Sequence, residues 1–276
     1  MAEFPTAGYS PAVSQLIQMG EEKARGPWPN YLELGISAEH IPELLHILAD
    51  IEAFWPEGDT ESVEVSAPIH AWRALGQLRA QEAVNPLIEL IIKNEELNVD
   101  WVMEEIPEVL GMIGPVSIPA IQDYLLNSEK KEWASVTLGH CLAEIGKRNP
   151  QSRSACIAAL EAGLENYSQN EYSVNGFLIS YLGDLKAVEA APLVERVYQA
   201  DAVDLSIMGD FEDYQIKVGL LKGRRTPPPR YDFLIDPLEK LEAEKKANRA
   251  EKRRERQQAK KEKKKRKQAK KNRHRR

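Results

Sequence analysis

Cysteine is scarce in this chain of 276 residues, which contains only Cys141 and Cys156. Two cysteines give no paired metal-ligand spacing and argue against a disulfide scaffold, a usage that fits a reducing compartment. Each cysteine lies in an apolar helical pattern. We therefore interpret both as small core residues rather than as catalytic nucleophiles.

Long apolar runs are also missing. No stretch approaches the roughly 18 apolar residues that a membrane-spanning helix needs. The first ten residues have neither the basic region nor the apolar core of a secretory signal. We therefore expect a soluble, cytoplasmic protein with no integral membrane segment.

Signatures of catalysis are absent from the sequence. It has no glycine-rich phosphate loop, no Gly-x-Ser-x-Gly motif and no zinc-binding spacing. His70 and His140 have no partner at the spacing of a catalytic triad or a metal site, so we expect each to be a packed or helix-surface residue. The sequence indicates no catalytic residue, no metal ligand and no cofactor, which favours a non-enzymatic role.

Charge, by contrast, is abundant and unevenly distributed. Residues 240–276 contain 20 lysines and arginines against 5 acidic residues, a net charge of +15. The rest of the chain contains 17 basic and 38 acidic residues, a net charge of −21, so the overall value of −6 hides a bipolar molecule. An acidic body with a basic tail can bind two kinds of partner, or the tail can bind the body.

One stretch, residues 74–91, sets the organisation of the chain. Its pattern predicts the end of one helix, a turn and most of a second helix. Gly76 allows another helix to approach closely, and Asn85 is expected to cap the second helix through its side-chain oxygen. Because a helix pair of this size cannot bury its apolar face alone, the stretch predicts neighbouring pairs.

Weaker copies of this stretch follow at residues 109–125, 141–164 and 178–198, and residues 41–48 suggest an opening copy. We align the copies on four anchor residues near the ends of their first helices, Arg79, Gly114, Gly146 and Gly183. Successive anchors are 35, 32 and 37 residues apart. Spacings in the thirties with two helices in each repeat predict an all-α protein, an α-solenoid of about four to five helix pairs.

The repeats resemble the HEAT-like repeats found in phycobilisome-lyase subunits and in many bacterial proteins. Their pattern is roughly Ala-Leu-Gly-x-Ile-Gly-Asp followed by Ala-Val-x-Pro-Leu-Ile, which residues 74–91 and 178–198 match well. The third copy departs from it at residues 147–154, and Arg79 stands where the family prefers glycine. The resemblance covers roughly residues 32–200 and implies the fold, whereas such repeats have unrelated roles.

The chain divides into four predicted parts. Residues 1–30 form an N-terminal extension, and residues 31–221 form the HEAT-like solenoid with a C-terminal cap. Asp210 and Asp213 predict a capping box at the start of the cap helix. Residues 222–237 form a proline-rich linker, read as a stiff spacer or as a docking motif. Residues 238–276 form a basic tail that is helical or disordered.

The tail is the clearest functional feature of the sequence. Its cations can contact successive phosphates and release their counterions, and without aromatic residues they would bind independently of base sequence. RNA, DNA, acidic lipid and the acidic body are all compatible ligands. The residues expected to bind nucleic acid are Lys263, Lys264, Lys265, Arg266, Lys267, Lys270, Lys271, Arg273, Arg275 and Arg276.

Tryptophans and acidic residues are the candidates for binding a protein. Trp72, Trp101 and Trp133 are either exposed binding anchors or core residues packed between repeats. Trp101 and Trp133 each lie thirteen residues before an anchor glycine, which predicts equivalent places near first-helix starts. Glu104 and Glu105 are adjacent, so their side chains point apart on a helix.

Two functions follow from these features. The preferred one is a non-enzymatic adaptor or scaffold, whose solenoid surface binds a protein and whose tail attaches to nucleic acid, with RNA as the first candidate. The alternative comes from the resemblance alone, which implies a bilin lyase subunit or a lyase-like chaperone acting on phycobiliproteins.

Overall fold

The computed structural model describes residues 8–20, 27–55, 62–127 and 129–229. Within these ranges the regular elements are α-helices and short 3-10 turns, and no strand is present. The protein is therefore all-α. The predicted tail and the end of the linker lie outside the described residues. The α-helices are α1 Pro11–Ile17, α3 Ile41–Ala49, α4 Ile51–Phe54, α5 Ala67–Leu78, α6 Val84–Leu97, α7 Asp100–Ile113, α8 Ile118–Leu126, α9 Glu132–Arg148, α10 Arg153–Glu165, α11 Tyr172–Asp184, α12 Ala191–Gln199, α13 Leu205–Met208 and α14 Phe211–Val218.

Four consecutive helix pairs share one local plan. In each, a first helix is followed by a short turn, one 3-10 turn and a second helix, in the pairs α5–α6, α7–α8, α9–α10 and α11–α12. The 3-10 turns begin 34, 35 and 38 residues apart, at Gln81, Pro115, Pro150 and Val188. Pro119 and Pro192 lie within the first two positions of their helices, where a missing N–H costs no intrahelical bond.

The prediction that the side chain of Asn85 caps the second helix of the first pair is wrong. Helix α6 begins at Val84, one residue earlier, and Ala83 occupies the N-cap without a side-chain bond. The 3-10 turn Gln81–Ala83 leads directly into the helix, and its carbonyls accept from the first N–H groups. Because the backbone already satisfies these groups, the helix needs no side-chain cap.

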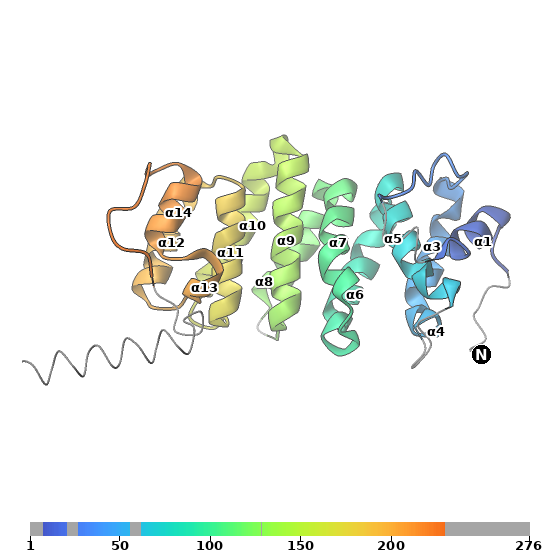
Figure 1. Ribbon diagram of the computed structural model, residues 1–276, viewed down its shortest axis with the longest axis horizontal. Helices are drawn as coiled ribbons and strands as arrows, with labels where there is room; N and C mark the ends of the chain where they lie inside the picture. The colour runs from blue at the N-terminus through green and yellow to red at the C-terminus, as the bar shows by residue number, and fades with distance from the viewer. Residues whose placement is uncertain (1–7, 21–26, 56–61, 128, 230–276) are drawn as a thin grey trace, which may run out of the picture. The chain divides into compact units, whose positions relative to one another are not determined.

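The first helices of the pairs pack side by side. Helix α5 contacts α7, α7 contacts α9, and α9 contacts α11, while α6, α8 and α10 form a second row against them (Figure 1). Helix α3 contacts both α5 and α6. The buried residues form one continuous apolar core between the rows, which agrees with the predicted mutual burial of neighbouring pairs.

Glycines set how closely the first helices approach. A Cβ atom built on Gly76 would lie 3.3 Å from Val109 Cγ1 of α7, which confirms the predicted close approach. Three more glycines, Gly111, Gly146 and Gly183, have similarly close contacts with a neighbouring helix or its end. Together with Gly76 they form a series with spacings of 35, 35 and 37 residues. The shorter predicted spacing of 32 residues arose because the four anchors are not equivalent. Arg79 and Gly114 lie three residues after members of this glycine series, whereas Gly146 and Gly183 belong to the series itself.

Helix α14 covers the end of the last pair. Asp210 and Asp213 form the predicted capping box, with each side chain accepting from the other residue's backbone N–H. Tyr214 is fully buried and its hydroxyl donates to the Ala187 carbonyl oxygen at 2.6 Å. The phenyl ring of Phe211 stacks on Tyr214, with 6.4 Å between ring centroids. The cap thus shields apolar surface that a terminal pair would otherwise expose.

No single helix among the described residues is long and apolar enough to cross a membrane. The pair Asp100–Ile113 and Pro115–Leu126 passes the same test only when taken together, and it is bent by 110° at its break.

Candidate functional site: an aromatic face and a C-terminal clasp

The outer face of α9 is the first candidate surface. This helix contacts α6, α7, α8, α10 and α11, so most of its sides are covered. The side chains that remain at least partly exposed include Trp133, His140 and Glu144. Spacings of seven and four residues place these three on one helical face. Trp133 is the most exposed tryptophan among the described residues, with 46% of its surface accessible.

Four aromatic side chains of α9 and α11 form a continuous aromatic stripe: Trp133, Phe177, Tyr181 and His140. Trp133 meets the edge of Phe177 with 6.4 Å between centroids, and Phe177 stacks on Tyr181 at 6.1 Å. The rings of Tyr181 and His140 are nearly parallel, 6° apart in plane and 5.4 Å between centroids. The stripe therefore presents ring surface from two adjacent helices on one side of the molecule.

Trp133 was predicted from the sequence as a candidate binding residue, whereas Phe177 and Tyr181 were not, and His140 was expected only to be packed or on a helix surface. The signal for the stripe was present in two helical spacings, Trp133 to His140 and Phe177 to Tyr181, each of which places aromatic rings on one face. The sequence does not show that α9 and α11 lie side by side, and this packing brings together residues more than forty positions apart.

A charge ladder borders the stripe and links the helices α7, α9, α11 and α14. Arg148 of α9 pairs with Glu108 of α7 at 2.6 Å, and Lys147 pairs with Asp184 of α11 at 3.4 Å. Asp184 in turn pairs with Lys217 of α14 at 2.5 Å. Burial opposes ionisation of Asp184, yet the hydrogen bond and charge of Lys217, with those of Lys147, hold its pKa below the usual value. The ladder fixes which residues of neighbouring helices face each other.

Two of the predicted protein-binding residues lie in the interior. Trp72 is fully buried, so the core residue holds among its two predicted alternatives and the exposed anchor does not. Glu105 is 8% exposed, so its predicted place on a binding surface is corrected. Glu105 Oε2 accepts from Trp72 Nε1 at 2.9 Å and from Arg73 Nε at 2.7 Å, and its Oε1 pairs with Arg73 Nη2. The carboxylate is buried because a buried guanidinium compensates its charge.

Trp101 and Glu104 lie nearer the surface. As expected, Trp101 and Trp133 are each the second residue of a first helix. Helix α9 has 17 residues and α7 has 14, so Trp133 lies about one turn farther from the shared glycine position. Trp101 packs against the Arg73 guanidinium at 5.8 Å and is half-buried, whereas Glu104 is exposed and Glu105 is not. The prediction that these two carboxylates point apart is confirmed.

His70 is a packed histidine, one of the two predicted possibilities. Its Nδ1 accepts from the Tyr31 hydroxyl at 2.7 Å, and its Nε2 donates to the Gly20 carbonyl oxygen at 3.2 Å. These bonds require the neutral ring with the proton on Nε2. Burial lowers the pKa of His70 to about 4.

Both cysteines are core residues, as predicted. Cys141 and Cys156 are buried and free. Burial raises the pKa of the Cys156 thiol to about 11 and raises that of Cys141 further. Because the thiolate is the reactive species, neither group is prepared for nucleophilic chemistry near neutral pH.

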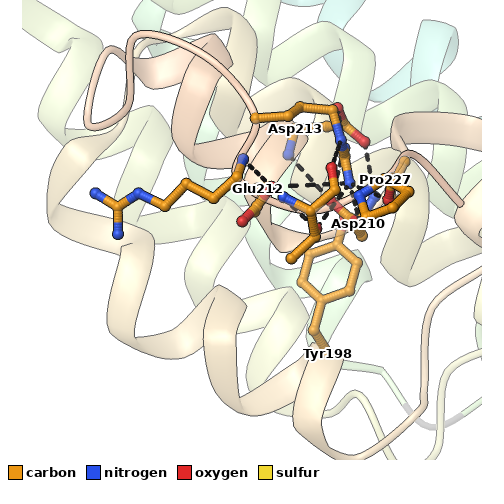
Figure 2. A network of polar contacts seen from close by, with 9 residues as sticks. Tyr198, Asp210, Glu212, Asp213 and Pro227 are labelled. Atoms are coloured by element: carbon orange, nitrogen blue, oxygen red, sulfur yellow. Dashed lines mark hydrogen bonds and ion pairs between the residues drawn. The ribbon is translucent and has the colours of Figure 1, made fainter.

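A clasp holds the start of the linker on α14 (Figure 2). Both Nη atoms of Arg224 pair with Asp210, at 3.0 and 2.5 Å, and Nη1 also lies 2.5 Å from Asp213 Oδ1. Glu212 Oε2 accepts from the backbone N–H groups of Arg225 and Thr226 at 2.9 and 3.0 Å. Residues 224–226 are therefore bound to the cap helix, and Arg224 is not a free docking residue.

The clasp residues remain charged in the folded protein. The hydrogen bond from Arg224 is the main cause of a lowered pKa at Asp210, and the N–H groups of Thr226 and Arg225 lower the pKa of Glu212. The chain divides into two units between Pro228 and Pro229, directly after the clasp and inside the predicted linker.

Among the described residues, no group of three or more His, Cys, Asp or Glu side chains could hold a metal ion. Comparison of the chain with protein-family models, with curated proteins and with solved structures gives no match. The function must therefore be argued from the surface itself.

Proposed function

We propose that the protein is a non-enzymatic, cytoplasmic adaptor whose body is an α-solenoid of HEAT-like repeats, similar in plan to those of phycobilisome-lyase subunits. Four helix pairs with a common turn at spacings of 34 to 38 residues support the repeat assignment. Stacked pairs of this kind provide an extended surface on which a protein partner can bind.

The aromatic stripe is the observation that carries the proposal. Large aromatic side chains dominate binding energy at protein interfaces, because they bury much area at little entropic cost. Here Trp133, Phe177 and Tyr181 remain at least partly exposed although the core beneath them is filled. We assign the stripe, with the outward Glu104 of the neighbouring helix, as the contact for the protein partner.

The basic tail supplies the second contact of the proposed adaptor. Residues 240–276 have a net charge of +15, which suits electrostatic attachment to RNA without readout of its sequence. Two linked contacts act together, because attachment through one raises the local concentration at the other. The adaptor would thus bring its protein partner to RNA.

Removal of residues 240–276 tests the RNA contact. We expect full-length protein to bind a fluorescent single-stranded RNA at 50 mM salt and to lose roughly three-hundredfold in affinity at 200 mM, since about six phosphate contacts release their counterions. The truncated protein should show no salt-sensitive binding, while its circular dichroism and melting temperature stay close to those of the full chain.

Equal RNA affinity of the two proteins at low salt would contradict the role of the tail. A matched control keeps the full chain length but replaces the ten named tail cations by glutamine. This control separates the effect of charge from the effect of chain length.

A further inference from the structure

We propose that the aromatic stripe binds an arginine-rich segment of the protein partner. This inference rests on the proposed adaptor function and specifies the chemistry of its partner. It depends on the ring geometry of α9 and α11, on the charges around them, and on a guanidinium site that the same molecule contains in its interior.

The interior site shows how this fold holds an arginine. The Arg73 guanidinium lies 5.1 Å from the ring centroid of Trp28 and 5.8 Å from that of Trp101, and Glu105 neutralises it. Indole faces attract a guanidinium through their negative π-surface, and a carboxylate adds paired hydrogen bonds. Two rings and one carboxylate are thus among the groups that hold an arginine in this protein, together with the Tyr31 hydroxyl.

The stripe offers the same groups at the surface. Trp133, Phe177 and Tyr181 supply the rings, and Glu144 lies beside the stripe, with its Oε1 3.7 Å from His140 Nε2. Glu144 Oε1 pairs with the ammonium of Lys147 at 2.9 Å, and Glu144 Oε2 lies 3.9 Å from Arg148 Nε. An incoming guanidinium can bind a carboxylate through two parallel bonds, which an ammonium cannot do.

The surrounding charge favours a cationic ligand over an anionic one. The chain outside the tail has a net charge of −21, and Glu104 on the adjacent helix is exposed and forms no ion pair with another described residue. Burial and the nearby Lys147 lower the pKa of His140, against the opposing effects of Glu144 and Asp184, so the ring is neutral near pH 7. Nucleic acid could stack on these rings, but its phosphates would meet an acidic body.

Peptide binding to the full-length chain provides the test. The probe is a fluorescein-labelled peptide of eight Arg-Gly repeats, compared by anisotropy with the equivalent Lys-Gly peptide at 150 mM salt. We expect the arginine peptide to bind more tightly. Trp133→Leu and Tyr181→Leu keep apolar bulk but remove π-surface, and each should weaken binding of the arginine peptide about three- to tenfold.

Tyr172→Leu is the matched control. Tyr172 lies on α11, is 59% exposed and belongs to no ring pair of the stripe, so its loss should leave peptide affinity unchanged. Melting curves of all three variants identify any loss of folding. Unchanged affinity in both folded stripe variants, or equal affinity for the two peptides, would overturn the proposal.

Two further outcomes are decisive. If removal of residues 240–276 strengthens peptide binding at least tenfold, the stripe is occupied by the chain's own tail, and the assignment to a partner is wrong. RNA affinity, measured on the same variants, reports separately on the proposed adaptor: RNA binding that persists while peptide binding fails rejects the arginine-rich ligand alone.

Discussion

At the scale of single residues, Arg79 and Lys186 adopt backbone conformations that suit glycine. Their φ angles are 53° and 55°. In each case the residue's N–H bonds back three residues and the next N–H bonds back five, from Arg79 to Gly76 and from Ala80 to Leu75 in the first case. This is the Schellman pattern, in which the left-handed residue is usually glycine. The positive φ angle at this position gives a physical reason why the HEAT-like repeats prefer glycine where Arg79 stands.

Replacement of Arg79 by glycine should therefore stabilise the protein. A side chain in the left-handed region costs about 1 kcal/mol relative to glycine, and we expect Arg79→Gly to raise the free energy of unfolding by about that amount in chemical denaturation. Gly114→Ala is the reverse control. Because Gly114 has a φ of 97°, a side chain at this position should lower the free energy of unfolding. A lower stability of Arg79→Gly would show that the arginine side chain makes a contribution larger than the strain.

His70 should make stability fall with acidification. Its pKa is about 4 in the folded protein and about 6.5 when unfolded, so the unfolded chain binds more protons between these values. Stability is therefore greatest above pH 6.5 and decreases as the pH falls toward 4, by up to about 3 kcal/mol from this residue. Denaturation of His70→Gln should show a shallower pH dependence over this window; an unchanged slope would contradict the assignment.

At the scale of elements, the glycines of α9 and α11 differ in how much a methyl group would disturb. A Cβ on Gly139 would lie 2.8 Å from Leu178 Cδ2 and 3.1 Å from the Tyr181 ring, both on the facing helix. At Gly183 the nearest atom, also at 2.8 Å, belongs to the Lys217 side chain, which is partly exposed and can move.

Gly139→Ala should consequently cost more stability than Gly183→Ala. Overpacking costs about 1–3 kcal/mol, against a helix-propensity gain of about 1 kcal/mol. We expect a net loss of about 1 kcal/mol for Gly139→Ala and a change near zero for Gly183→Ala, measured by chemical denaturation. Equal effects would mean that the two helix contacts relax equally well.

The elements also show what the sequence could predict. The helix pairs, the close approach at Gly76 and the capping box at Asp210 were predictable, because each depends on local spacing. The burial of Glu105 was not, since it depends on its pairing with Arg73 of the neighbouring α5. The aromatic stripe and the clasp were missed for the same reason, because Trp133 meets Phe177 and Arg224 meets Asp210 only through tertiary contacts.

At the scale of the whole molecule, the clasp fastens residues 224–226 to α14 at the end of the last helix pair. Arg224→Gln removes the bonds to Asp210 and Asp213, so the amides of Arg225 and Thr226 should lose their contact with Glu212. We expect their hydrogen exchange to accelerate at least tenfold, while amides of α14 change little. Arg225→Gln is the control, because only its backbone N–H takes part in the clasp. Unchanged exchange in Arg224→Gln would show that Glu212 holds the segment alone.

The clasp also determines how tension would enter the fold. If the tail is attached to one large object and the body to another, a pull on the tail reaches Arg224 before it reaches α14. The guanidinium bonds to two carboxylates of the α14 N-terminus, so force is spread over parallel ionic bonds rather than over one peptide segment. Helices that are held only by their neighbours peel from an end one at a time, and this fastening would set the force at which peeling begins.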